Sequence, residues 1–312
     1  MTDSWDADMR AAHQAMDAAA ALEPAAVMAE PFDACRAISE RLAMAWVKPE
    51  PVMAETRDYW ILAQGRRVQC RVHRPRTDRK LPVLVWFHGG GWVLHSIDTH
   101  DGLAREYALA AEMAVVSVDY ALAPEAKFPK ALFECVSVVR QLAGLDWGID
   151  AGRIVLGGDS AGGNLAIATA LVLRDMGGPA LRGILPLYPV VDCDFTRPSY
   201  RQYAEGFGMT GAAMHVFWDL YARDAADRLN PLAAPLRADL AGLPPTLLQL
   251  AEMDVLRSES EVMAERLRAA GVDVTLKSYS GVLHGFVRLV GAVAKARVAV
   301  DDAAVWLRAV TA

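Results

Sequence analysis

The chain has 312 residues, a net charge of −6 and 54% hydrophobic residues. This composition supports a large buried core within one main domain, and the lack of a basic cluster excludes a nucleic-acid partner. The four cysteines are widely spaced, without a Cys-x-x-Cys pair or a His/Cys cluster at zinc-like spacing. We therefore expect reduced thiols and no bound metal.

The amino-terminal segment is acidic and lacks the apolar core of a secretory signal. The alanine-rich stretch Ala18–Ala29 is interrupted by Glu23 and Pro24, and no uninterrupted apolar run reaches the roughly 18 residues of a membrane span. We therefore expect a cytoplasmic protein without a membrane span. The sequence does not specify the oligomeric state, and a homodimer is compatible with it.

Short apolar runs alternate with helical patterns over most of the chain, which is typical of a mostly parallel sheet covered by helices on both faces. This predicts an α/β fold whose earliest strands are free to pair antiparallel. Chemical groups are then expected at the carboxyl ends of the strands. The expected strands are Tyr59–Ala63, Val68–His73, Pro82–Phe87, Ala114–Tyr120, Arg153–Leu156, Arg182–Leu187, Thr246–Ala251 and Val274–Tyr279.

Two stretches lie outside this alternation, residues 1 to about 50 and residues 195 to about 235. Amphipathic helical patterns cover Asp3–Leu22 and Phe32–Val47 in the first stretch and Gly211–Arg223 in the second. We interpret both stretches as a helical cap over a catalytic domain of residues 51–312, into which the second stretch is inserted. Packing helices without a cap role are the alternative, and the sequence alone does not choose between them.

The strand expected at Pro82–Phe87 runs directly into the sequence HGGGW at residues 88–92. Three residues without side chains leave their backbone N–H groups unobstructed, which suits a site that stabilises negative charge developing on an oxygen. Each preorganised donor of this kind can contribute about 3 kcal/mol. Gly90 and Gly91 are the expected donors, together with the N–H of Ala161.

A second glycine-rich turn, GDSAGGN at residues 158–164, precedes a helical pattern at Leu165–Met176. Gly158 and Gly162 flank Ser160 at the two positions where a sharp strand-to-helix turn requires small residues. Such turns also arise without a catalytic function. The upstream glycine loop favours a nucleophilic serine here.

A serine nucleophile needs a base within hydrogen-bond reach, and the base needs an acid that orients it. Of the seven histidines, only His284 is expected at the end of a strand, in a short loop at residues 280–286. The acid is expected between Ser160 and His284. Asp254 fits best because it follows the strand at Thr246–Ala251 and precedes a helical pattern, and Glu252 is its competitor.

These motifs resemble, in order and over nearly the whole length, the hormone-sensitive-lipase-like (bacterial family IV) carboxylesterases of the α/β-hydrolase superfamily. DYALAPE at residues 119–125, DVLR at 254–257 and HGF at 284–286 belong to the same pattern, and Asp159 indicates the GDSAG subgroup. The resemblance implies an α/β-hydrolase fold with a helical cap, and chemistry that requires neither a cofactor nor a metal. It also implies a triad of Ser160, Asp254 and His284, with Gly90, Gly91 and Ala161 as the oxyanion hole.

The chain departs from the family pattern at several positions. Ala121 stands where the family usually has arginine and Ala126 where it usually has histidine. Val255 and Ser258 replace the commoner proline and aspartate of the acid loop. His95 occupies a position that is commonly glycine, and its imidazole either narrows the acyl pocket or faces solvent.

We predict a serine carboxylesterase that hydrolyses short-to-medium acyl esters through an acyl-enzyme. An amidase or deacetylase with the same triad is the nearest alternative, and retention of His284 argues against a small-ligand receptor of the same fold. Bulky residues near the motifs predict a crowded pocket and an optimum at acyl chains of roughly two to six carbons. The candidate pocket residues are Trp92, Leu94, His95, Tyr188, Phe207, Met209 and Leu283.

Overall fold

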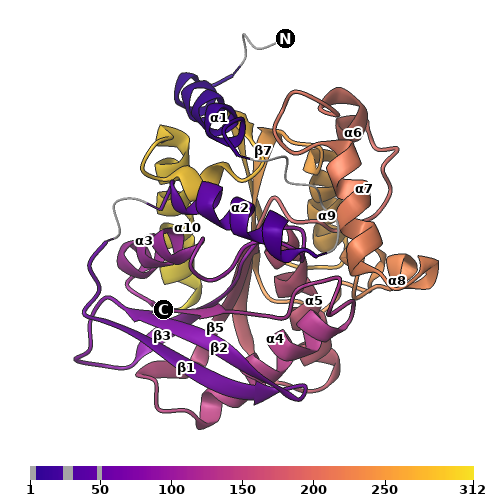
Figure 1. The fold of residues 1–312 in the computed structure, drawn as a ribbon. Coiled ribbons are helices and arrows are strands. Elements are labelled where there is room, and N and C mark those ends of the chain that lie inside the picture. The colour runs from indigo at the N-terminus through magenta and orange to yellow at the C-terminus, as the bar shows by residue number, and fades with distance from the viewer. Residues whose placement is uncertain (1–4, 24–30, 48–50) are drawn as a thin grey trace.

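The computed structural model describes residues 5–23, 31–47 and 51–312 (Figure 1). Its strands form one sheet in the order β1-β2-β4-β3-β5-β6-β7-β8. β2 pairs antiparallel with β1 and β4, and all other neighbours are parallel, which confirms the predicted α/β class. The strands are β1 (Glu55–Ala63), β2 (Arg66–Arg74), β3 (Leu81–Phe87), β4 (Ala114–Val118), β5 (Ile149–Asp159), β6 (Leu181–Leu187), β7 (Thr246–Met253) and β8 (Val274–Leu283).

Helices cover both faces of this sheet. α5 (Ala161–Asp175) packs on β3, β5 and β6 and against α4 (Lys130–Gln141), while α3 (Asp101–Ala111) and α10 (Ala294–Val310) pack against each other on the other face (Figure 1). α9 (Arg257–Ala269) packs on β7. α5 is buried from Ala161 to Leu173, as expected of a helix that is apolar nearly all round. The short 3₁₀ helices are η1 (Leu142–Gly144), η2 (Pro235–Arg237) and η3 (Phe286–Leu289).

Most strands extend beyond their predicted bounds, whereas β4 ends at Val118, before the predicted Tyr120. β5 begins at Ile149, and β8 continues through Leu283 instead of ending at Tyr279. The extra length of β8 follows a register shift between β7 and β8, and Gly281 has a positive φ of 69° within it. His284 therefore follows the strand directly, which corrects the predicted loop at residues 280–286.

The amino-terminal helices α1 (Ala7–Ala20) and α2 (Asp33–Met44) precede the sheet in the chain. The Asp6 side chain caps α1 by accepting hydrogen bonds from the backbone of Asp8 at 3.1 Å and of Met9 at 3.3 Å. Both helices begin and end inside the predicted ranges, and Asp3 lies outside the described residues. The Asp6 N–H also donates to the Gly281 carbonyl oxygen at 2.8 Å, so α1 is joined to β8.

The second predicted stretch forms three helices between β6 and β7, namely α6 (Pro198–Gln202), α7 (Gly211–Tyr221) and α8 (Ala225–Leu229). Thr210 caps α7 by accepting from the Ala213 N–H at 3.0 Å. The Lys127 ammonium donates to the backbone oxygens of Asp219 at 3.0 Å and Ala222 at 2.9 Å. These bonds fix the end of α7 to the segment that follows β4.

Among the helices that the structure describes, none combines the length and apolar character needed to cross a membrane. Over residues 5–23, 31–47 and 51–312, no three His, Cys, Asp or Glu side chains gather as the ligands of a metal ion do.

Candidate active site

Ser160 lies at the sharp turn between β5 and α5, with a φ of 55° and a ψ of −118°. A positive φ is strained for a residue with a side chain, and such strain persists only where the surroundings enforce it. A Cβ on Gly158 would lie 2.5 Å from the carbonyl oxygens of Gly162 and Phe87, and a Cβ on Gly162 would lie 1.9 Å from that of Phe87. Close backbone packing therefore excludes any side chain at both glycines.

Three side chains from three strand ends form one hydrogen-bonded chain. The Oγ of Ser160 lies 2.9 Å from Nε2 of His284, and Nδ1 of His284 lies 2.7 Å from Oδ2 of Asp254. An ionised carboxylate can only accept, so His284 carries its hydrogen on Nδ1 and offers the Nε2 lone pair to the serine hydroxyl. This arrangement suits the transfer of a proton from Ser160 to the imidazole.

Asp254 is held in place by the backbone that follows β7. Its Oδ1 accepts a hydrogen bond from the Leu256 N–H at 2.9 Å, and its side chain is almost fully buried. Glu252 points elsewhere, because its Oε2 accepts from the Gly281 N–H at 2.8 Å. The structure thus brings Asp254 to His284 and places Glu252 between β7 and β8.

The glycine loop after β3 approaches the turn at Ser160 from the neighbouring strand. Gly90 and Gly91 have positive φ values of 116° and 61°. A Cβ on Gly90 would lie 2.2 Å from the Leu94 carbonyl oxygen, and one on Gly91 would lie 2.3 Å from the Phe217 ring. Within the part of the chain that the structure describes, the N–H groups of Gly90 and Gly91 donate to no protein acceptor. Ala161 begins α5, so its N–H has no partner inside the helix.

Asp159 connects this loop to the turn at Ser160. Its Oδ1 accepts from the Gly89 N–H at 2.9 Å, and its carboxylate lies 3.1 Å from Nε2 of His100. Burial alone would raise the pKa of Asp159, but the charge and hydrogen bond of His100 outweigh it and lower the pKa to about 2. Asp159 is therefore ionised at neutral pH and keeps both hydrogen bonds.

His88, at the start of the same loop, is held by Tyr120. The Tyr120 hydroxyl donates to the His88 carbonyl oxygen at 2.6 Å, and the two rings stack with centroids 4.3 Å apart. Burial, together with the nearby charge of His100, lowers the pKa of His88 to about 3. His88 is therefore a neutral packing residue at physiological pH.

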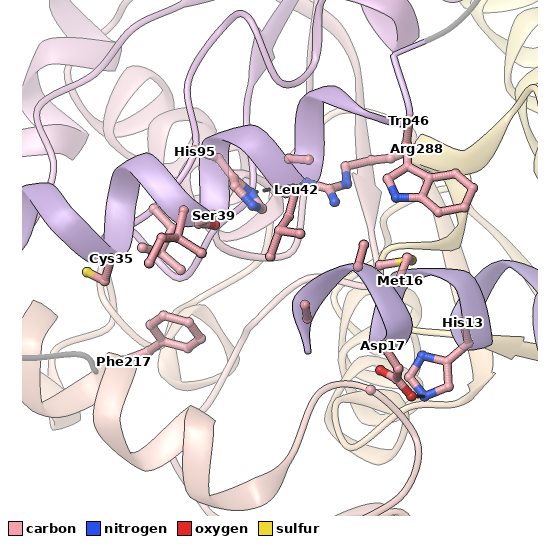
Figure 2. A pocket seen from close by; sticks show the side chains of 16 residues that line it. His13, Met16, Asp17, Cys35, Ser39, Leu42, Trp46, His95, Phe217 and Arg288 are labelled. Carbon is pink, nitrogen blue, oxygen red and sulfur yellow. Dashed lines mark hydrogen bonds and ion pairs between the residues drawn. The ribbon is translucent and has the colours of Figure 1, made fainter. Parts of the chain in front are cut away.

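A cavity of about 460 Å³ lies between the amino-terminal helices and the loop that follows β3 (Figure 2). Met16 comes from α1 and Leu42 from α2, and Phe217 of α7 lies opposite them. A second cavity, of about 60 Å³, shares Met16 and Arg288 with the first and also includes His284. The two cavities adjoin, so the space under α1 and α2 reaches the triad.

Four of the seven predicted pocket residues line these cavities or contact the triad. Leu94 and His95 line the large cavity, and Leu283 lines the small one. Tyr188 meets the His284 ring edge-on, with centroids 4.9 Å apart. His95 is half-buried and faces the cavity, so the structure favours the pocket-facing alternative for this residue.

Trp92 differs from its predicted place on the pocket wall. Its indole is fully buried, stacks on Tyr221 with centroids 4.0 Å apart, and meets Trp218 edge-on. Both partners belong to α7, so the Trp92 ring packs in the core against that helix. Among the described residues, Trp92 is not one of those that line the two adjoining cavities.

Phe207 and Met209 also lie outside the lining of the two cavities, although Gly208 between them contributes to both. Phe207 packs against Trp5 and Tyr203, with ring centroids 5.8 Å and 5.0 Å away. Phe207 thus joins the amino-terminal segment to the second helical stretch, and only Gly208 of these three residues lines the cavities.

Sequence reasoning missed the residues that form most of the large cavity. Met16, Leu42 and Trp46 lie on or after helices whose amphipathic patterns were recognised, but the pattern does not say what each apolar face contacts. Phe217 was part of a predicted helix. Arg288 had a local signal, since a basic residue four positions after His284 stands in an otherwise apolar stretch.

The chain matches a family described as having the alpha/beta hydrolase fold over residues 84–288. It is 40% identical to carboxylesterase NlhH of Mycobacterium tuberculosis (strain ATCC 25618 / H37Rv) over 227 residues, which covers 70% of this chain and 71% of that protein. It is 37% identical to an arylesterase of Saccharolobus solfataricus over 254 residues, covering 80% and 82% of the two chains.

Solved structures show the same similarity in three dimensions. A thermostable esterase from Pseudomonas putida aligns with a TM-score of 0.93 at 36% identity and covers 100% of this chain and 99% of its own. A hyperthermophilic esterase from Pyrobaculum calidifontis aligns with a TM-score of 0.92 at 35% identity, covering 98% of each chain. A mutant of the esterase rPPE, complexed with (S)-Ac-CPA, also aligns with a TM-score of 0.93.

Proposed function

Because the chain belongs to the hormone-sensitive-lipase-like carboxylesterases of the α/β-hydrolase fold, we propose that it hydrolyses short-to-medium acyl esters through an acyl-enzyme on Ser160. The observation that carries this proposal is the hydrogen-bond chain from Ser160 through His284 to Asp254. A receptor that only binds a ligand has no need for a base placed in this way.

The first half of the reaction forms the acyl-enzyme. Nε2 of His284 takes the proton of Ser160 as Oγ attacks the ester carbonyl carbon, and Asp254 stabilises the imidazolium that results. The tetrahedral intermediate then loses its alcohol: the bond from carbon to the alcohol oxygen breaks, and His284 gives its proton to that oxygen. The acyl group remains on Ser160 Oγ.

The second half repeats the sequence with water. His284 removes a proton from a water molecule whose oxygen attacks the acyl carbon, and the bond to Ser160 Oγ breaks as His284 returns the proton. The products are the carboxylic acid and the free serine hydroxyl. Every proton transfer in this cycle uses a side chain of the triad.

The oxyanion formed in each half is assigned to the N–H groups of Gly90, Gly91 and Ala161. Support comes from the free N–H groups of the glycine loop and from the start of α5, both next to Ser160. Such donors contribute most when they are fixed before the reaction begins. Asp159 supplies that fixation by binding the Gly89 N–H.

The acyl or alcohol chain is assigned to the adjoining cavities beneath α1 and α2, which we propose as a cap together with α7. Each buried methylene adds about 0.8 kcal/mol of favourable transfer free energy until the cavity is full. The cavity that includes His284 measures only about 60 Å³, which favours short chains next to Ser160. We therefore expect an optimum at roughly two to six acyl carbons.

The test is hydrolysis of p-nitrophenyl esters over a series of acyl lengths by the wild type and by Ser160→Ala. Removal of the nucleophile should lower kcat by about 10⁶-fold and leave the far-UV circular dichroism unchanged. A fluorophosphonate probe should label Ser160 of the wild type, as located by peptide mass spectrometry. Labelling of another serine, or binding of esters without turnover, would contradict the proposal.

A further inference from the structure

Arg288 is the one arginine on the lining of the two adjoining cavities within the described residues. It lies on η3, four residues after His284, and its side chain is half-buried. Figure 2 shows its guanidinium beside His95 on the wall of the large cavity. A cation is therefore placed within the space that leads to the triad.

The guanidinium has no acidic partner among residues 5–23, 31–47 and 51–312. Its one hydrogen bond runs from Nη1 to Nδ1 of His95 at 3.1 Å. Two carboxylates share a pocket lining with Arg288, and each has another partner: Asp17 lies 3.4 Å from His13, and Glu106 pairs with Arg297 at 2.7 Å. Most of the donors of Arg288 thus bind no acceptor in the described part of the chain.

His95 does not neutralise or repel this charge. Since Nδ1 accepts from Arg288, the imidazole carries its hydrogen on Nε2 and is neutral. Burial, followed by the charge of Arg288, lowers the pKa of His95 well below its usual range. The pair formed by His95 and Arg288 therefore carries a single positive charge over the working pH range.

Two other half-buried arginines of the protein each bind a carboxylate. Arg36 binds Glu125 at 2.6 Å, and Arg197 binds Asp192 at 2.6 Å. The donors of Arg288 that bind no protein acceptor stay open to the cavity rather than sealed in the core. A planar carboxylate complements the forked donors of a guanidinium in two parallel hydrogen bonds. For Arg288, no carboxylate of the described residues fills that role.

We propose that Arg288 forms a carboxylate subsite, and that the preferred substrates are esters carrying a free carboxylate a few bonds from the scissile carbonyl. This inference rests on the proposed esterase function. In the productive complex the ester carbonyl lies at Ser160, the carboxylate receives two N–H donors of Arg288, and the intervening methylenes contact the apolar walls. The carboxylate is borne either by the acyl group or by the alcohol.

The first experiment uses the wild type and matched ester pairs. Monomethyl esters of dicarboxylic acids are compared with methyl alkanoates of equal chain length, and acetate esters of ω-hydroxy acids with alkyl acetates. We expect kcat/KM for one anionic series to exceed that for its neutral series at a preferred length, because the guanidinium is fixed. The series that shows the preference identifies the side of the ester that carries the charge.

The second experiment compares Arg288→Met, Arg288→Lys and the surface control Arg201→Met. Arg201 is exposed and lines none of the cavities. Arg288→Met should lower the ratio of anionic to neutral kcat/KM by at least about tenfold, because a charge-assisted hydrogen bond contributes about 1.5–3 kcal/mol. Any change that the substitution makes in the shape of the cavity affects anionic and neutral esters of equal length alike, so it cancels in this ratio. Arg288→Lys should keep part of the preference, and Arg201→Met should keep all of it.

Turnover of the neutral esters separates the two proposals. If the wild type hydrolyses neutral esters but shows no anionic preference at any length, the subsite is wrong and the esterase function stands. An equal loss for both kinds of ester in Arg288→Met would assign Arg288 a structural role and overturn the subsite. If no ester is hydrolysed and Ser160 remains unlabelled by the phosphonate, the proposed function itself fails.

Discussion

The carboxyl edge of the sheet and the helices α1 and α2 above it are built in different ways. At the sheet edge, Asp159 and Asp254 bind backbone N–H groups, and the glycines beside Ser160 leave no room for a side chain. The helices instead present apolar side chains to a cavity and keep their polar faces exposed. Backbone geometry therefore fixes the positions of the proposed catalytic groups, whereas side-chain packing determines the space for a substrate.

The attachments of the two regions differ as well. The polar contacts of α2 with the segments around β3 and β4 include those of Arg36, whose Nε donates to the Val93 carbonyl oxygen at 2.9 Å and whose Nη2 donates to that of Ala123 at 2.8 Å. α1 is joined to β8 through the Asp6 N–H. Few polar contacts of this kind fix a helix less firmly than a sheet ladder does, so we expect the amino-terminal helices to tolerate more change.

The largest expected effect on kcat comes from replacing Asp254, the proposed acid at the carboxyl edge of the sheet. Asp254→Asn should lower kcat by about 10⁴-fold, because an amide in that place favours the wrong tautomer of the histidine. Glu252→Gln should change kcat by less than about threefold, since the amide oxygen can still accept from Gly281. Steady-state kinetics of both variants on one ester gives the ranking, and the reverse ranking would transfer the acid role to Glu252.

Removal of residues 1–45 should have the next largest effect, because it takes away α1 and α2 but none of the triad. We expect kcat/KM for the best ester to fall by about tenfold or more and the dependence on acyl length to flatten, as the apolar contacts that discriminate between chains are lost. Phosphonate labelling of Ser160 should persist. The exposed apolar surface favours aggregation, so the truncated chain is measured as a monodisperse fraction from size exclusion. Unchanged kinetics at every length would rule out a cap role.

A smaller effect, on the free energy of unfolding, is expected when Asp159 is replaced, because Asp159 joins the glycine loop to the turn at Ser160. The pKa of Asp159 is lowered in the folded protein to about 2. Its ionised form therefore stabilises the fold by about 2 kcal/mol above pH 4, and this contribution is lost as the pH falls through about 2. Asp159→Asn should be less stable than the wild type at pH 7, and the difference should shrink between pH 4 and pH 2.

Urea unfolding of both proteins at several pH values measures this difference in the free energy of unfolding. A surface variant, Asp175→Asn, provides a control, because the Asp175 carboxylate is exposed beside Arg174. A difference between wild type and Asp159→Asn that stays constant with pH would contradict the assignment of Asp159 as an ionised, buried partner of His100.

The smallest expected effect is a change of preference at the cavity. His95 has a positive φ of 71°, which glycine adopts without strain. His95→Gly should shift the optimum acyl length upward by about one or two carbons, since the imidazole no longer occupies the cavity wall. Measured on neutral p-nitrophenyl esters, an unchanged length profile would show that the imidazole does not limit the chain.

The residues recognised from sequence are those whose role depends on local backbone geometry. Gly158, Ser160 and Gly162 form a turn that few other residues permit, and the glycine loop at residues 89–91 follows a strand. The alternation of apolar runs and helical patterns is likewise a local property, so the class of the sheet was predicted. Asp254 was preferred to Glu252 because it lies between the predicted strand and the helical pattern that begins near Ser258.

The features that the sequence did not predict depend on contacts between segments far apart in the chain. Trp92 was placed on the pocket wall, but the direction of its ring is set by Trp218 and Tyr221 in a helix more than a hundred residues away. The contact of Arg288 with His95 is of the same kind. Sequence periodicity identifies an apolar face without identifying what packs against it.

Asp159 and Ser160 are consecutive residues, and this adjacency determines how the site responds to thermal motion. One peptide bond joins the nucleophile to the carboxylate that holds Gly89, and Gly89 in turn is bonded to the first proposed oxyanion donor. A displacement of the end of β5 therefore carries the serine and the glycine loop in the same direction. We therefore expect the separation between Ser160 Oγ and the proposed oxyanion donors to vary less than the absolute positions of either.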